Sequence, residues 1–150
     1  MTAYIAAGVL DAARDFFESR GAEGCEGTAL IAGIPREPAT RLIIPDQIAV
    51  PSPRASVTIT AKGDLQLAVA LADIERYIAR IHSHPGLAFH SETDNDNPVL
   101  THEGALSIVA PWFGLGLRRG LGACAVYEHH NGIWTALLAG PERDAVLAVV

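Results

Sequence analysis

The stretch Ile78-Ala-Arg-Ile-His-Ser-His-Pro-Gly86 has the pattern of a β-strand that runs into a sharp turn. Side chains on a strand repeat every second residue on one face, so His82 and His84 should point the same way. Their imidazoles would then lie close enough to share one metal ion. Because Pro85-Gly86 ends the strand, both histidines are expected at its open end.

A third metal ligand is available further along the chain. Catalytic zinc sites take three protein ligands from His, Asp, Glu or Cys and leave a fourth position for water, whose pKa falls towards neutrality. Asp94 lies ten residues after His84, beyond the reversal at Pro85-Gly86. Ser91 and Asp94 also have the Ser-x-x-Asp spacing that opens a short helix. The histidine pair and the Ser-x-x-Asp spacing each occur often in proteins that bind no metal at that place. Their combination favours a metal site.

Hydrolysis at such a site also needs a general base that is not itself a metal ligand. This base takes a proton from the water and later hands it to the leaving amine. The carboxylates that could serve are Glu23, Glu26, Glu75, Glu92 and Asp96. Spacing alone does not choose among them.

The surrounding sequence alternates between helical and strand periodicities. Apolar spacings of three and four predict helices over 2–19 and 64–74, the second with Asp64 as N-cap. Strands are expected over 28–32, in two neighbouring pieces of 41–50 split at Pro45-Asp46, and over 56–60, 78–84, 105–110, 123–128 and 133–138. Asn131-Gly132 favours a type I′ hairpin turn. This order of elements predicts one domain, residues 1–150, of the α/β (α+β) class. We expect a single layered sheet in which the strands of 41–50 lie beside the strand 56–60.

The composition argues against several kinds of partner. Only 11 of 150 residues are Lys or Arg and the net charge is −6, which leaves no basic stripe for nucleic acid. Residues 1–10 lack the basic segment that precedes the apolar part of an export signal. No apolar run reaches the roughly 20 residues of a bilayer span. We therefore expect no membrane partner and a cytoplasmic location. In that compartment Cys25 and Cys124 are expected to be buried thiols.

His82-Ser-His-Pro-Gly86 followed by Ser91-x-x-Asp94 resembles the JAMM motif of the JAB/MPN metalloprotease family. In that family a glutamate lies far upstream, in a strand that ends in Leu-x-x-Gly. The segment Glu26-Gly-Thr-Ala-Leu-Ile-Ala-Gly33 is similar to that strand through Leu30 and Gly33. The resemblance therefore selects Glu26 among the carboxylates.

Carried over to these positions, the resemblance implies one zinc ion per chain, held by His82, His84 and Asp94. It implies Glu26 as general base and acid, and Ser91 as the hydroxyl that stabilises the tetrahedral oxyanion. It also implies a cytidine-deaminase-like JAB/MPN sandwich, in which a mixed β-sheet is flanked by helices.

Two positions depart from the family pattern. Six residues separate His84 from Ser91, one fewer than is usual in the family, so the loop before Ser91 is shorter. Ala29 stands where the family usually has a glycine, a small replacement that a strand tolerates.

Further aromatic residues lie close to the motif. His90 could be an extra ligand or a substrate contact, but a supporting or surface position is favoured. Trp112 and Phe113 could line a substrate groove, although such pairs are more often core or loop anchors. The remaining histidines are expected to be exposed turn residues: His102, His129 and His130.

The resemblance extends to bacterial family members found beside E1- and E2-like enzymes, some of them in antiphage operons. The segments Phe89-His-Ser-Glu-Thr-Asp-Asn95 and Gly104-Ala-Leu-Ser-Ile-Val-Ala-Pro111 carry it. It implies an isopeptidase that cleaves after the C-terminus of a ubiquitin-like protein, free or conjugated, with E1- and E2-like enzymes as further partners. The substrate tail would add to a sheet edge. The alternatives are a catalytically inactive MPN scaffold, which usually lacks metal ligands, and a zinc hydrolase of small molecules.

Overall fold

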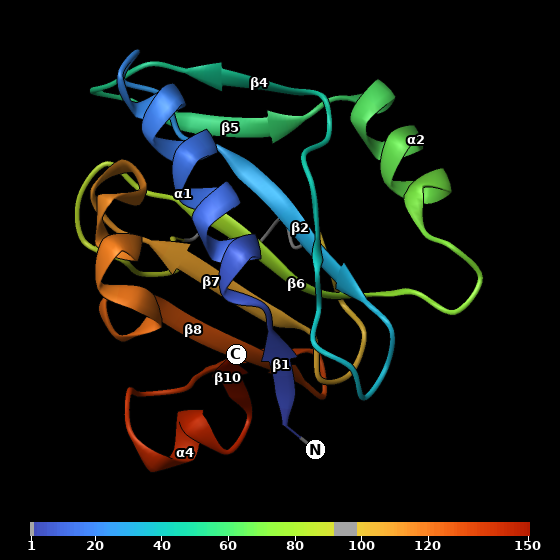
Figure 1. Ribbon diagram of the computed structural model, residues 1–150. Coiled ribbons are helices and arrows are strands. Elements are labelled where there is room, and N and C mark those ends of the chain that lie inside the picture. Colours follow the sequence, from blue (N-terminus) through green and yellow to red (C-terminus); the bar gives the residue numbers. More distant parts are fainter. Residues whose placement is uncertain (1, 92–98) are drawn as a thin grey trace.

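A computed structural model describes residues 2–91 and 99–150. Within them, a six-stranded mixed sheet forms the centre, in the order β3-β2-β6-β7-β8-β9 (Figure 1). Its strands are β2 (Thr28–Gly33), β3 (Arg41–Ile43), β6 (Arg76–Ser83), β7 (Leu106–Ala110), β8 (Ala125–His130) and β9 (Ile133–Ala136). β6 and β7 run parallel, and the other neighbours are antiparallel. The expected mixed sheet flanked by helices is confirmed.

Two further strand pairs lie outside the central sheet. β1 (Ala3–Ile5) runs parallel to β10 (Leu147–Val149), which brings the two ends of the chain together, and β4 (Gln47–Val50) pairs with β5 (Ser56–Ile59). The helices of the described residues are α1 (Ala7–Gly21), α2 (Ala61–Ala70), the 3-10 segment η1 (Trp112–Ala123) and the short α4 (Pro141–Asp144). The expectation of one sheet was therefore wrong, because β4 and β5 pair apart from β3, which joins β2.

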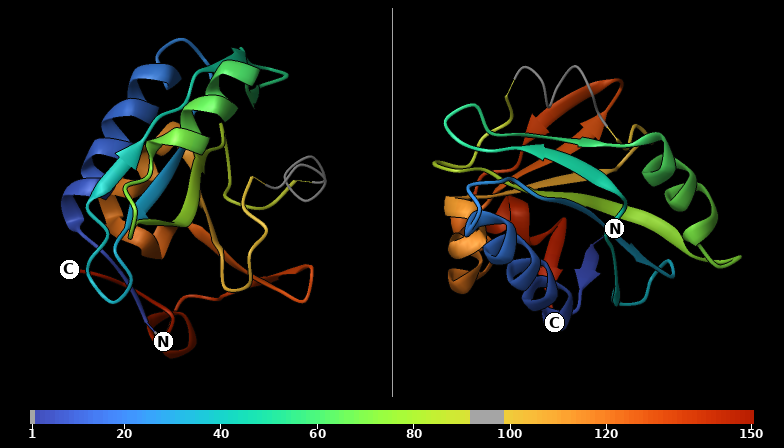
Figure 2. Two further views of the ribbon diagram at one scale, coloured as in Figure 1. Left: turned by 90° about the vertical axis from the view of Figure 1, so that its right-hand side faces the viewer. Right: turned by 90° about the horizontal axis from the view of Figure 1, so that it is seen from above.

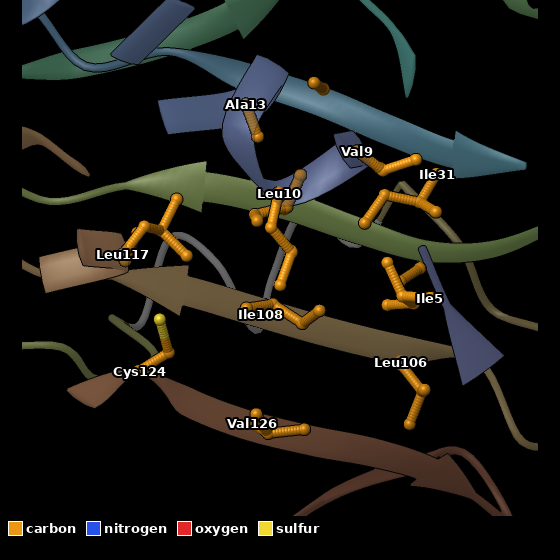
Figure 3. Packing of buried hydrophobic residues seen from close by; sticks show 14 of the residues in the cluster. Ile5, Val9, Leu10, Ala13, Ile31, Leu106, Ile108, Leu117, Cys124 and Val126 are labelled. Carbon is orange, nitrogen blue, oxygen red and sulfur yellow. The ribbon is translucent and has the colours of Figure 1, made fainter. Parts of the chain in front are cut away.

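Alternate residues of the central strands face two separate hydrophobic cores. Leu10 of α1 is buried with Ile31 and Ile108 in the larger core, to which Leu117 of η1 also contributes (Figure 3). Leu30, which points to the other face, packs with Leu67 of α2 in the smaller core. α1 and α2 therefore cover opposite faces of the sheet (Figure 2).

Every predicted strand forms, with ends shifted by a few residues, whereas both predicted helices begin elsewhere than expected. Residues 3–5 are a strand because they pair with residues 147–149, a contact that a local pattern cannot reveal. α2 begins after Thr60, whose Oγ1 accepts a hydrogen bond from the Gly63 N–H at 3.0 Å, so Asp64 is not the N-cap. The helix expected after Ser91 lies outside the described residues.

The predicted hairpin turn at Asn131-Gly132 is confirmed. Both residues have positive φ, 51° and 78°, and they connect the paired residues His130 and Ile133 of β8 and β9. η1 was not predicted, because short 3-10 turns carry no long periodicity. None of the helices in the described ranges has the length and apolar character that a bilayer span requires.

Ser83 joins β2 to β6 beyond the end of their ladder. The Gly27 N–H donates to Ser83 Oγ at 2.9 Å, and the Ser83 N–H donates to the Gly27 carbonyl at 3.0 Å. Ser83 is fully buried. Because Glu26 directly precedes Gly27, this pair of bonds fixes the start of β2 against the end of β6.

Replacing Ser83 with alanine should lower the free energy of unfolding by about 1–3 kcal/mol, because the buried Gly27 N–H loses its acceptor. Urea denaturation followed by circular dichroism measures this change. Ser19→Ala, at an exposed position of α1, is the matched control and should stay within about 0.5 kcal/mol of the parent. Equal stability of the parent and Ser83→Ala would contradict this role for the bond.

Candidate metal centre

β6 presents its histidines on the face of the sheet opposite α1. His82 lies opposite Thr28 in the pairing with β2, whereas Ile81 lies opposite Ala29. Ile81 and Ala29 belong to the core under α1, so His82 points to the other face. His84 follows two residues later, just past the end of β6.

The two imidazoles lie against each other. The ring centroids of His82 and His84 are 5.1 Å apart, with their planes at 61°. Only 1% of His82 and 6% of His84 is exposed. The His84 N–H donates to the Ala110 carbonyl at 2.9 Å, which continues the pairing with β7 and fixes the backbone of His84. The predicted ligand pair is therefore close together and nearly buried.

A cleft of about 330 Å³ brings four of the five predicted site residues together: Glu26, His82, His84 and Ser91. Its remaining walls come from the start of β5, from β6 and from the turn after it, through Ala55, Ser56, Val57, Arg80, Pro85, Gly86, Leu87 and Phe89. The fifth predicted residue, Asp94, lies outside the described residues. The cleft therefore holds two predicted ligands, the predicted base and the predicted oxyanion donor.

Glu26 reaches this cleft from the start of β2. It is 8% exposed, and it directly precedes Gly27, which is hydrogen-bonded to Ser83 between the two histidines. The chain therefore holds a carboxylate and two imidazoles at neighbouring ends of paired strands. Such a set can bind a metal and transfer protons at the same place.

The other carboxylates considered from sequence do not reach the cleft or are not described. Glu23 is exposed on the turn after α1. Glu75 precedes the opposite end of β6, where it forms an ion pair with Arg41. Glu92 and Asp96 lie outside the described residues. Among the described carboxylates, Glu26 is the one that lines the cleft.

Arg80 is a cleft residue that the sequence analysis missed. It lines the cleft, and its Nε donates to Thr28 Oγ1 at 3.0 Å. Arg80 could have been predicted from the sequence, because side chains repeat every second residue along β6 and Arg80 therefore shares a face with His82 and His84. Its guanidinium adds a permanent positive charge beside the predicted metal ligands.

Ser91 reaches the cleft because the loop after His84 folds back onto the sheet at His90. The His90 N–H donates to Tyr127 Oη at 2.9 Å, and its Nε2 lies 2.7 Å from Ser107 Oγ. The shortened loop therefore still brings Ser91 to the wall that contains the histidines. His90 lies behind the cleft, in the supporting position that the sequence favoured.

The donor set fits a zinc ion by its chemistry, because zinc accepts two imidazoles from one strand face together with an aspartate, and Asp94 follows His84 by ten residues in the sequence. Within residues 2–91 and 99–150, no three His, Cys, Asp or Glu side chains gather as a metal site. The expected third ligand, Asp94, is outside those ranges. Zinc binding by His82, His84 and Asp94 therefore stays a prediction.

A second hollow, of about 610 Å³, adjoins the cleft at Leu87, which lines both. Trp112 lines this hollow with 52% of its surface exposed. Phe113 instead lies against α1, where the missing side chain of Gly21 makes room for its ring. The predicted pair therefore separates, with Trp112 at a groove and Phe113 as an anchor.

The backbone at Trp112 and Phe113 is left-handed, with φ of 56° and 53°. This conformation costs a residue other than glycine about 1–2 kcal/mol. Two hydrogen bonds hold the turn, from the Trp112 N–H to the Gly86 carbonyl at 3.0 Å and from the Phe113 N–H to the His84 carbonyl at 2.7 Å. The turn therefore ties Trp112 to the segment that carries His84.

The expectation that three further histidines are exposed was wrong for one of them. His129 is buried in β8, with its ring centroid 4.8 Å from that of Trp134 on the paired strand β9. Burial here depends on the neighbouring strand, which a turn-based prediction did not consider. His102 and His130 are exposed.

The two cysteines are buried and free, as expected. Burial raises the pKa of the Cys124 thiol to about 12, so it stays protonated at neutral pH. Cys25 is not among the described residues that line the cleft. In its described part the cleft therefore offers imidazole and carboxylate groups rather than thiols.

No family model matches the chain. One curated relative, named a probable metalloprotease, comes from Sinorhizobium fredii and is 56% identical over 36 residues. The match covers 24% of this chain and 22% of that protein. The chain therefore matches the relative over about a fifth of the relative's length.

Two solved structures resemble the whole chain. A JAB1/MPN domain protein from Archaeoglobus fulgidus has a TM-score of 0.53 at 18% identity, over 99% of this chain and 98% of that one. A protein from Desulfitobacterium hafniense has a TM-score of 0.57 at 12% identity, over 100% and 93%. At these identities the likeness is one of fold. The chain therefore shares its fold with a JAB1/MPN domain protein.

Proposed function

We propose that the protein is a zinc-dependent peptidase of the JAMM type, which cleaves the amide or isopeptide bond after the C-terminus of a ubiquitin-like protein. The observation that carries this proposal is the cleft that Glu26, His82, His84 and Ser91 line together. The relative named a probable metalloprotease supports a metal-dependent peptidase. The ubiquitin-like substrate rests on the resemblance of the motif and on the strand edge beside the cleft.

In this proposal His82, His84 and Asp94 hold one zinc ion per chain. When bound, zinc supplies a Lewis acid that polarises the scissile carbonyl and lowers the pKa of a water molecule towards neutrality. Each histidine would hold the ion through one ring nitrogen. Their burial in the cleft keeps competing water away from these nitrogens.

Glu26 carries the proton transfers. Its carboxylate takes a proton from the attacking water as the new carbon–oxygen bond forms, and it then passes the proton to the amine nitrogen as the carbon–nitrogen bond breaks. The amine therefore leaves in its neutral form. The Ser91 hydroxyl donates a hydrogen bond to the carbonyl oxygen while negative charge develops there.

The start of β5 offers a place for the substrate tail. Ala55, Ser56 and Val57 line the cleft, and within residues 2–91 and 99–150 β5 pairs with β4 alone. Its other edge can accept the backbone of an extended peptide as an added strand. The C-terminal tail of a ubiquitin-like protein is such a peptide, and a cleft of about 330 Å³ favours small residues before the scissile bond.

His82→Ala and His84→Ala should each lose most of their bound zinc, because two ligands cannot hold the ion as tightly as three. Zinc content per chain, measured by mass spectrometry of the metal after dialysis, should be about one in the parent. His102→Ala, at an exposed histidine away from the cleft, is the control and should retain the parent content. Equal zinc in His84→Ala and the parent would contradict the assignment.

Glu26→Gln should keep zinc but lower kcat by about 10²–10⁴, because the amide cannot accept the proton. Release of a fluorescent amine from the C-terminus of ubiquitin-like proteins measures this rate. Glu23→Gln changes an exposed carboxylate three residues away and should leave the rate unchanged.

Three outcomes would overturn parts of this proposal. Full activity of Glu26→Gln would exclude Glu26 as the base. A zinc-loaded parent that cleaves none of these substrates would favour the inactive scaffold. A parent that hydrolyses small amides but no ubiquitin-like conjugate would favour the small-molecule hydrolase.

Trp112→Ala should raise KM about 5–10-fold and change kcat less than about threefold, because an exposed indole beside the cleft contributes binding rather than chemistry. Steady-state kinetics with the same fluorescent substrates separates the two constants. Leu138→Ala removes an apolar side chain that is 75% exposed and is the control. An unchanged KM in Trp112→Ala would remove the second hollow from the substrate path.

A further inference from the structure

We propose that His90 is a positioning residue that anchors the loop after His84 to the central sheet and thereby fixes the Ser91 hydroxyl at the cleft. The catalytic consequence of this anchor rests on the proposed function. The anchor itself is a property of the loop, and it can be measured without turnover.

The loop is not fixed by an apolar core of its own. Its large side chains Leu87 and Phe89 are 70% and 51% exposed. Near its start, the Gly86 carbonyl accepts a hydrogen bond from the Trp112 N–H. The far end of the loop is held by the Phe89 ring, which meets the His84 ring edge-on with centroids 5.0 Å apart, and by the return of the chain to the sheet at His90.

Three strands hold His90 at that point. Its ring stacks on Tyr127 of β8, with centroids 3.9 Å apart and planes at 18°, and it meets Trp134 of β9 edge-on at 5.4 Å. Its Nε2 lies 2.7 Å from the Oγ of Ser107 in β7, and its backbone N–H donates to Tyr127 Oη at 2.9 Å. Both the ring and the backbone of His90 are therefore restrained.

This anchor lies beside the predicted metal ligands. Ser107 is in register with Arg80 of β6 and with Tyr127 of β8, so the three side chains form a row next to His82 on the same face. The ring centroids of His90 and His82 are 6.4 Å apart. Adjacent Cα atoms are about 3.8 Å apart, so a fixed His90 confines Ser91 to the edge of the cleft.

The same contacts argue against His90 as an additional zinc ligand. Its Nε2 is directed at Ser107, which is only 2% exposed, so water does not compete for that hydrogen bond. The ring is also stacked flat on Tyr127, which restricts its rotation towards His82. Both the hydrogen bond to Ser107 and the stacking on Tyr127 instead attach His90 to the sheet, as an anchor requires.

Nitrogen-15 relaxation of the zinc-loaded protein tests the anchor directly. His90→Ala should lower the order parameter of the Ser91 amide from about 0.85 to below about 0.6, because the loop loses its attachment. Tyr127→Phe, which removes the acceptor of the His90 N–H but keeps the stacked ring, should lower it less. His102→Ala is the control and should leave it unchanged. An unchanged order parameter in His90→Ala, or loss of zinc from that variant, would overturn the proposal.

A double-mutant cycle with Ser91→Ala tests the catalytic consequence. His90→Ala should lower kcat about 10–100-fold with little change in KM, because a displaced donor acts mainly on the transition state. In the Ser91→Ala background the same change should cost less than about threefold, since the group that it positions is already gone. An equal loss in both backgrounds would overturn the proposal. A parent that cleaves no ubiquitin-like substrate would contradict the proposed function. The order parameter of the Ser91 amide would still show whether His90 anchors the loop.

Discussion

The antiparallel register between β2 and β6 is the constraint on which the candidate metal centre depends. Thr28 lies opposite His82, and the paired hydrogen bonds of Gly27 and Ser83 continue the contact past the strand end. A shift of β6 by one residue would turn His82 into the core under α1 and expose Ile81 in the cleft. The packing of the core and the chemistry of the cleft are therefore specified by the same pairing.

Each predicted reactive group lies where regular structure ends, and a contact with the sheet holds it there. Glu26 precedes β2 beside the bonded Gly27, and the backbone of His84 is fixed by Ala110 at the end of β7. Ser91 follows a loop that rejoins the sheet at His90. The sheet thus supplies rigidity while its ends and loops supply the functional groups, as is common for binding sites.

Strands and the shared face of His82 and His84 were predictable from sequence, because a period of two is a local property of the chain. Glu26 was not predictable in that way: the junction that fixes it joins residues 56 positions apart, so only the family motif selected it. The start of α1 and the burial of His129 were missed for the same reason, because each depends on a partner strand that local sequence does not name.

X-ray absorption spectroscopy at the zinc edge of the metal-loaded protein tests most directly whether this strand end is a metal centre. The account predicts nitrogen and oxygen ligands at about 2.0–2.2 Å, with the outer-shell scattering of two imidazoles from His82 and His84. Sulfur ligands at about 2.3 Å, or the scattering of fewer than two imidazoles, would contradict it.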